Sequence, residues 1–266
     1  MRSAAISASL TLVPVIRLGR LGLDWLAALG RFGIFLGQAL FYLVIPPFKL
    51  GEAVRRVWFI GFRSLSVVVL TGAFTGLVLG LEGMLMLRRV GSEAFVGPLV
   101  AIALVRELGP VLAGLMVTGR AGSAIAAELG VMRISEQIDA LTVMALNPMR
   151  YLVVPTLVAG IVAMPLLAWI FDVVGIFGGF LVTVSIFGLS KGTYFGQIRA
   201  FFSTTDMWVG AWKALVFGML MMWVATYKGF HVGYGAEGVG RATTEAVVLA
   251  SVLILVFDYF LGSVLP

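Results

Sequence analysis

The chain has 266 residues, of which 61% are hydrophobic and 12% are charged, and its mean hydropathy is +1.07. A soluble protein of this size needs far more polar surface, so the composition identifies an integral membrane protein and argues against a soluble enzyme. The absence of cysteine and the single His231 argue against redox and metal chemistry, and the net charge of +6 is typical of basic loops on the cytoplasmic side of a bilayer rather than of nucleic-acid binding.

The first 50 residues include an apolar stretch that is interrupted by polar residues at helical spacing. These polar residues are Arg17, Arg20, Asp24, Arg31 and Gln38. They fall on one stripe of a helix, opposite leucine, tryptophan and phenylalanine, which is typical of a helix lying in the membrane interface. Residues 1–50 are therefore predicted to form an amphipathic interfacial region, with a sixth membrane span as the alternative.

Residues 51–266 are predicted to form an all-α domain with five transmembrane helices, because a helix crosses the hydrocarbon core with about 20 apolar residues. The five apolar stretches are roughly residues 57–87, 95–119, 151–187, 206–229 and 243–264. Segments expected inside hold twelve Lys and Arg residues, Arg120 among them, whereas those expected outside hold four. This bias predicts a cytoplasmic N-terminus and, after five crossings, a periplasmic C-terminus.

A glycine ridge runs along the first span at Gly72, Gly76 and Gly80. Glycines at this spacing let two helices approach until their backbones touch. The ridge is expected to serve either packing within the chain or the seam of a homodimer.

The segment from residue 120 to residue 150 is the one long loop predicted between spans on the cytoplasmic side. Ser135 is a predicted helix N-cap, followed by Glu136 in the first turn. The predicted apolar face consists of Ile134, Ile138, Leu141 and Ala145. A short amphipathic helix at about residues 121–146 can rest on lipid or provide a docking surface, and periodicity alone leaves both open.

Two stretches resemble the MlaE family, also called YrbE-like. They are RELGPVLAGLMVTGRAGSAIAAELGVMRISEQIDALTVMALNP at residues 106–148 and GVGRATTEAVV at residues 238–248. Members of this family are permease subunits of bacterial ABC transporters that move phospholipids or other hydrophobic molecules with MCE-domain proteins. The resemblance covers about residues 50–264.

The resemblance implies several partners. It implies a homodimer in the inner membrane with a cytoplasmic ABC ATPase, a periplasmic ring of MCE-domain protein and, in some systems, a STAS-domain protein. The chain lacks G-x-x-x-x-G-K-[ST], so ATP and Mg are expected on the ATPase, with no cofactor and no catalytic residue in this chain. It further implies that residues 121–146 form a coupling helix and that Gly238–Thr244 give a second contact. The expected ATPase-contact residues are Glu128, Arg133, Glu136, Gln137, Asp139 and Arg241.

Four charged residues fall inside the predicted spans, where ionisable groups usually pair or face a wet cavity. Arg106 and Glu107 are expected about 15 to 18 Å from the outer face, near the midplane, and Lys213 and Asp258 at matching depth nearer that face. Either these groups tie helices together, or they line a cavity that accepts a lipid headgroup. Adjacent Arg106 and Glu107 need separate partners because they point about 100° apart on a helix. The apolar residues expected to hold lipid tails are Leu77, Leu81, Met84, Leu85, Leu108 and Val111.

Gly109 and Pro110 follow the first charged pair. Proline removes a backbone N–H, so this turn is expected to be weakened and to open onto the cavity. Arg106 is expected to offer its guanidinium to a phosphate there.

The function expected from these features is that of the permease in an ATP-driven transporter moving phospholipid between the inner membrane and a periplasmic MCE protein. The alternatives are a membrane enzyme that modifies lipid and an ion-coupled secondary transporter. The near absence of His and Cys argues against the first alternative, and the lack of internal repeats against the second.

Overall fold

The computed structural model describes residues 2–45, 50–233 and 235–265, and for residues 2–21 and 50 it describes the backbone alone. All regular structure in these ranges is helical, as the sequence predicts. The chain divides into two compact units, Met1–Pro46 and Pro47–Pro266, which are described separately.

The first unit is one continuous helix, α1 (Arg2–Val44). Its part from Gly22 to Val44 is long and apolar enough to cross a membrane. The interfacial position therefore stays a prediction, and so does its alternative, a sixth span.

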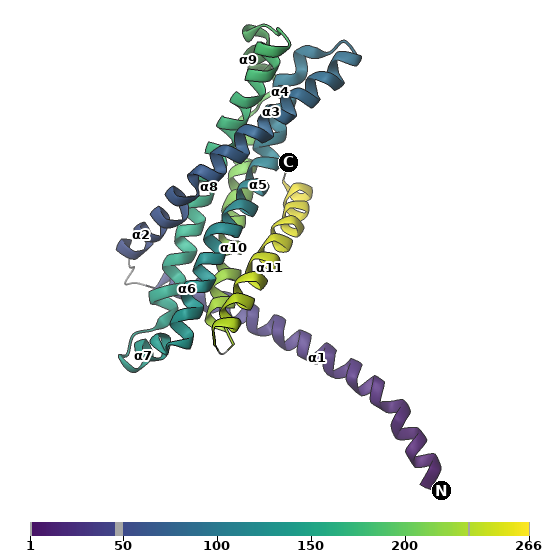
Figure 1. Cartoon of the computed structure of the whole chain (residues 1–266), viewed down its shortest axis with the longest axis vertical. Helices are drawn as coiled ribbons and strands as arrows, with labels where there is room; N and C mark the ends of the chain where they lie inside the picture. The colour runs from purple at the N-terminus through teal and green to yellow at the C-terminus, as the bar shows by residue number, and fades with distance from the viewer. Residues whose placement is uncertain (1, 46–49, 234, 266) are drawn as a thin grey trace. The chain divides into compact units, whose positions relative to one another are not determined.

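The second unit is a bundle of long helices joined by short turns (Figure 1). Five segments in it are long and apolar enough to span a membrane: Gly51–Arg89, Glu93–Ile134, Met149–Ile186, Thr204–Phe230 and Gly235–Val264. They contain the helices α2 (Leu50–Gly61), α3 (Leu65–Arg89), α4 (Val96–Ala103), α5 (Gly109–Val117), α6 (Ser123–Ile134), α8 (Val154–Phe180), α10 (Thr204–Phe230) and α11 (Gly235–Val264). These segments contain four of the five predicted spans whole and the third from residue 151 to residue 186.

Three of these long segments also contain turns of other helical geometry, inside the segment or at its ends. The π-helical turns are η3 (Leu104–Leu108), η4 (Thr118–Gly122), η5 (Met149–Val153) and η6 (Leu181–Ile186), and a 3₁₀ turn, η1 (Phe62–Ser64), separates α2 from α3. A π-turn leaves one carbonyl without its usual partner and redirects nearby side chains. Of these turns, η4 lies within residues 106–148, the longer stretch that resembles the MlaE family, and η3 overlaps its start.

The glycine ridge of α3 packs against α8 within the same chain. A Cβ on Gly76 would lie 2.6 Å from Gly175 Cα, and one on Gly80 would lie 2.8 Å from Gly179 Cα. Only glycine permits backbones this close. The structure thus supports packing within the chain, and the expectation of a homodimer seam at this ridge is wrong because α8 already fills it.

The helix α10 lies at the centre of the unit, against α8, α6 and α11. Val111 packs with Phe217, Leu220 and Ile254 in a buried apolar cluster. This cluster joins α5, α10 and α11 and so holds in place the helices that carry the charged groups described below.

The segment from residue 120 to residue 150 differs from the predicted loop. The membrane helix continues without a break to Ile134, so Arg120 lies in η4 and not in a loop. Ser135 is not an N-cap: its hydroxyl donates to the Val131 carbonyl at 2.7 Å, and Glu136, with a φ of 58°, precedes the short helix α7 (Gln137–Val143). Ile138 alone of the predicted apolar face is fully buried.

The opposite end of the unit carries α9 (Lys191–Phe201) beside α4 (Figure 1). Tyr194 is buried there, and its hydroxyl donates to the Ile176 carbonyl at 3.0 Å. Burial raises the pKa of the Tyr194 phenol, so this group stays protonated and keeps its donor. α9 is therefore anchored to α8 at the end away from α7.

Candidate functional site

The charged pair Arg106 and Glu107 lies in the π-turn η3, directly before Gly109 and Pro110. The Gly109 N–H bonds to the Leu104 carbonyl, five residues back, and Pro110 has no N–H to offer the next carbonyl. The expected weakening of the helix at this point takes the form of a π-turn. Its opening onto a cavity remains a prediction.

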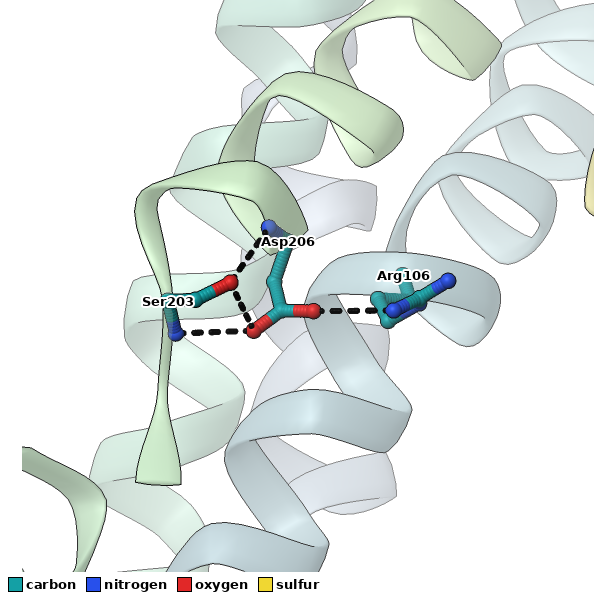
Figure 2. Close-up of polar contacts among 3 residues, drawn as sticks. All are labelled: Arg106, Ser203 and Asp206. Carbon is teal, nitrogen blue, oxygen red and sulfur yellow. Dashed lines mark hydrogen bonds and ion pairs between the residues drawn. The ribbon is translucent and has the colours of Figure 1, made fainter. Parts of the chain in front are cut away.

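Arg106 forms an ion pair with Asp206 at the start of α10 (Figure 2). The distance from Arg106 Nη1 to Asp206 Oδ1 is 3.0 Å, and the other oxygen of Asp206 accepts from the Ser203 backbone N–H at 2.8 Å. The Ser203 hydroxyl in turn accepts from the Asp206 N–H, which completes a capping box. We call Arg106 and Asp206 the outer pair; the same carboxylate caps α10 and binds Arg106.

Glu107 and Asp258 both bind the ammonium group of Lys213, and we call these three residues the lysine triad. The distance from Lys213 Nζ to Asp258 Oδ1 is 3.0 Å, which confirms the predicted pairing, and Glu107 Oε2 is a second direct partner. The Lys213 side chain is 0% exposed, whereas that of Glu107 is 48% exposed. Arg106 and Glu107 therefore have separate partners, as their helical spacing predicts.

The structure places Arg106 relative to α10. Its guanidinium reaches Asp206 in the first turn of that helix, whereas the carbonyl of the neighbouring Val105 lies against Gly210, about one turn further along. The depth of Arg106 in the membrane stays a prediction.

Together the outer pair and the lysine triad contain two basic and three acidic side chains. They join η3 to α10 and α11, so three of the spanning segments meet here. Arg106 and Glu107 keep part of their side chains exposed, and Lys213 has none. The arrangement can hold helices together and still present one guanidinium and one carboxylate to a ligand.

The predicted apolar residues fall into two groups. Leu81 and Leu85 are exposed on α3, and Leu77 and Leu108 are partly exposed. Met84 and Val111 are buried within the chain at 1% and 8% exposure, so they pack helices and offer little surface to a lipid tail.

The predicted ATPase-contact residues lie at the end of the unit formed by α6 and α7, and Arg241 lies on α11. Arg133 donates to Asp139 at 2.6 Å, Glu128 pairs with Arg56 at 3.2 Å, and Arg241 donates to Glu245 at 2.9 Å. Glu136 and Gln137 are exposed. The structure brings Arg133, Glu136, Gln137 and Asp139 together and leaves Arg241 on a different helix.

An open hollow of about 530 Å³ lies beside α7 and includes Val143 and Met144. These side chains are 89% and 69% exposed, outside the apolar face that the periodicity predicts. A partner that docks on α7 meets apolar surface as well as charge.

Two further residues lay outside the predicted set. Asp206 is recognisable in hindsight from the S-x-x-D spacing of a capping box. Arg120 donates to the Phe59 carbonyl at 3.1 Å and to the Ser64 hydroxyl at 3.0 Å, and so fixes the junction of α2 and η1. No sequence pattern predicts that contact, because it joins residues 61 and 56 positions apart.

Among the described residues, no three His, Asp or Glu side chains gather as metal ligands.

Comparison with known proteins shows the same similarity along nearly the whole chain. Residues 53–264 match the family Permease MlaE. A probable ABC transporter permease protein of Rickettsia bellii is 42% identical over 234 residues, which cover 88% of this chain and 90% of the relative. The intermembrane phospholipid transport system permease protein MlaE of Haemophilus influenzae is 37% identical, covering 93% and 95% of the two chains. The chloroplastic protein TRIGALACTOSYLDIACYLGLYCEROL 1 of Arabidopsis thaliana is 32% identical, covering 86% of this chain and 66% of the relative.

Proposed function

The chain belongs to the MlaE permease family, and from this premise we propose that it is the membrane-spanning permease of an ATP-driven transporter that moves phospholipid between the inner membrane and a periplasmic MCE-domain protein. The observation that supports this most directly is the placement of the outer pair and the lysine triad. They concentrate five ionisable side chains at the meeting point of three spanning segments, with the exposed parts of Arg106 and Glu107 available to a headgroup.

Arg106 is the residue proposed to bind the lipid phosphate. Its guanidinium has five N–H donors, and the bond to Asp206 uses Nη1. Asp206 fixes the orientation of the guanidinium, so little side-chain freedom is lost when a phosphate binds. Glu107 is proposed to contact the remainder of a headgroup, and the exposed leucines Leu81 and Leu85 to contact acyl chains.

ATP hydrolysis is assigned to a partner subunit, which binds ATP and Mg. The proposed docking surface is α7 with the end of α6, where exposed Glu136 and Gln137 adjoin the Arg133–Asp139 pair and the apolar Val143 and Met144. Closure of the ATPase is transmitted from this surface through α6 to α5, η3 and α4, because these elements belong to the one segment Glu93–Ile134.

The assembly is proposed to contain two copies of this chain, an MCE ring and, in some systems, a STAS-domain protein. The α7 end is assigned to the cytoplasm and the α9 end to the periplasm, following the distribution of Lys and Arg. Under this assignment the outer pair lies in the half of the bundle that faces the MCE protein.

The test is lipid transfer by the purified transporter after reconstitution into vesicles. Arg106→Ala is expected to reduce phospholipid transfer at least tenfold while leaving assembly and basal ATP hydrolysis near normal. Arg106→Lys is expected to restore only part of the loss, because lysine keeps the positive charge but lacks the planar guanidinium that can bind a phosphate through two N–H groups. Arg89→Ala removes an exposed arginine at the outer end of α3 and serves as the matched control.

A photocrosslinker at position 106 locates the lipid directly. Capture of phospholipid at this position supports the assignment. Normal transfer by Arg106→Ala together with no captured lipid would show that the outer pair only packs helices. Turnover without ATP would instead favour the alternatives, a lipid-modifying enzyme or an ion-coupled transporter.

A further inference from the structure

Asp172 is a buried acidic residue in the middle of the bundle that takes no part in the outer pair or the lysine triad. It lies on α8 and is 4% exposed. Its Oδ1 atom has no hydrogen-bond partner among the described residues. An ionised carboxylate at such a place is strongly destabilising unless a cation or hydrogen-bond donors surround it.

The Asp172 carboxyl group faces the π-turn η3. A Cβ on Gly109 would lie 2.8 Å from Asp172 Cγ, closer still to Oδ1, and 3.0 Å from the Leu104 carbonyl oxygen. Gly109 is thus needed to make room for the carboxyl group, and Oδ1 and the Leu104 oxygen both lie close to its Cβ position. Two neighbouring acceptors repel unless a hydrogen atom lies between them.

The elements packed against α8 supply no cation to this carboxyl group. The helices α4 and α5 have no ionisable side chain, and α3 has none from residue 65 to residue 81. The charged groups of η3, and those of α10 near its outer end, already form the outer pair and the lysine triad. On the inner side, α2 reaches α8 near Ala163, about 14 Å along the helix from Asp172.

We propose that Asp172 is a proton-binding site within the membrane, at which the carboxyl group is protonated and donates a hydrogen bond from Oδ1 to the Leu104 carbonyl of η3. The proton comes from water and returns to water when the site opens. The Leu104 carbonyl already accepts the Gly109 N–H in the π-turn and has a second lone pair for the acid. Proton binding therefore favours the π-form of η3, the turn that positions Arg106 and Glu107.

Infrared spectroscopy of the full transporter in lipid nanodiscs tests the proposal, because a carboxylic acid and a carboxylate absorb at well-separated frequencies. The wild-type spectrum minus that of Asp172→Asn at neutral pH is expected to show an acid C=O band that shifts in heavy water. Asp206→Asn is the matched control and is expected to remove carboxylate bands only, since Arg106 and Ser203 hold Asp206 ionised. Loss of carboxylate bands alone from Asp172→Asn would overturn the proposal.

Thermal stability gives a second readout. The asparagine amide can donate to the same carbonyl, so the melting temperature of Asp172→Asn is expected to lie within about one or two degrees of the wild-type value. Asp172→Ala has no donor, and its melting temperature is expected to be clearly lower. If Asp172→Asn does not fold, a hydrophobic carbodiimide applied to the wild-type protein replaces it, because this reagent modifies protonated carboxyl groups in apolar surroundings. An adduct mapped to Asp172 by mass spectrometry supports the proposal; adducts at Glu107 or Asp258 with Asp172 unmodified contradict it.

Discussion

Lys213 is the residue on which the stability of the charged site depends most. Its ammonium group is fully buried and holds both Glu107 and Asp258. Lys213→Met is expected to lower the free energy of unfolding by about 3–5 kcal/mol, because it leaves two carboxylates without their cation. Asp258→Asn is expected to cost about 1 kcal/mol, since Glu107 still binds the lysine. Unfolding of the detergent-solubilised protein, followed by circular dichroism, measures both.

The charge-swapped double variant Lys213→Asp with Asp258→Lys provides the control for this prediction. The aspartate introduced by Lys213→Asp would face Glu107, so the exchange is expected to recover only part of the loss. Full recovery would show that Glu107 does not contact Lys213. If Asp258→Asn lowered the free energy of unfolding as much as Lys213→Met does, Lys213 would not be the more important residue of the two.

The sequence predicts some of these contacts and not others. The Lys213–Asp258 pairing follows from opposite charge at matching depth in two apolar helices. Asp206 was not predicted because it lies in the first turn of a span, where an acidic residue needs no partner beyond water and the helix N-terminus. Its contact with Arg106, 100 positions away, depends on how α10 packs against η3.

At the scale of helices, the seam between α3 and α8 depends on the absence of side chains at a few glycines. Gly76→Ala is expected to lower the free energy of unfolding by about 3 kcal/mol, because the new Cβ would collide with the Gly175 backbone. Gly196→Ala on α9 is the matched control, because nothing lies within 4 Å of its Cβ position. Alanine there is expected to raise the free energy of unfolding by about 0.5–1 kcal/mol. Thermal unfolding of the two variants side by side makes the comparison, and equal melting temperatures would contradict the close packing.

Hydropathy predicts where helices cross the membrane but not where they end. The span predicted to stop at residue 119 continues as helix to Ile134, because backbone hydrogen bonds do not end at the lipid boundary and the buried Ile125 and Leu129 pack the extension onto α10 and α11. The prediction of Ser135 as an N-cap is also wrong. Its local pattern fits a helix start, but its hydroxyl donates to the Val131 carbonyl in the preceding turn.

At the scale of the transporter, α7 is expected to be the contact that joins this chain to its ATPase. Met144→Asp and Glu136→Lys change exposed side chains on the α7 hollow and its rim, and each is expected to reduce copurification of the ATPase severalfold without lowering the melting temperature. Lys191→Asp, at the opposite end of the unit, is the control and is expected to leave the association unchanged. Wild-type copurification with both α7 variants would assign docking to another surface.

The number of membrane crossings decides the side on which the N-terminus lies, and the absence of cysteine makes it directly measurable. Single cysteines are introduced at Ser3, Glu136 and Lys191 and treated with a membrane-impermeant maleimide in intact spheroplasts. If residues 1–50 lie in the inner interface, as the polar stripe of α1 indicates, Ser3→Cys and Glu136→Cys are protected and only Lys191→Cys is labelled. All three react after the membrane is permeabilised, which controls for accessibility. Labelling of Ser3→Cys from outside, with Glu136→Cys still protected, would instead make Gly22–Val44 a sixth span, because the basic α7 end would remain cytoplasmic while the N-terminus had crossed the bilayer.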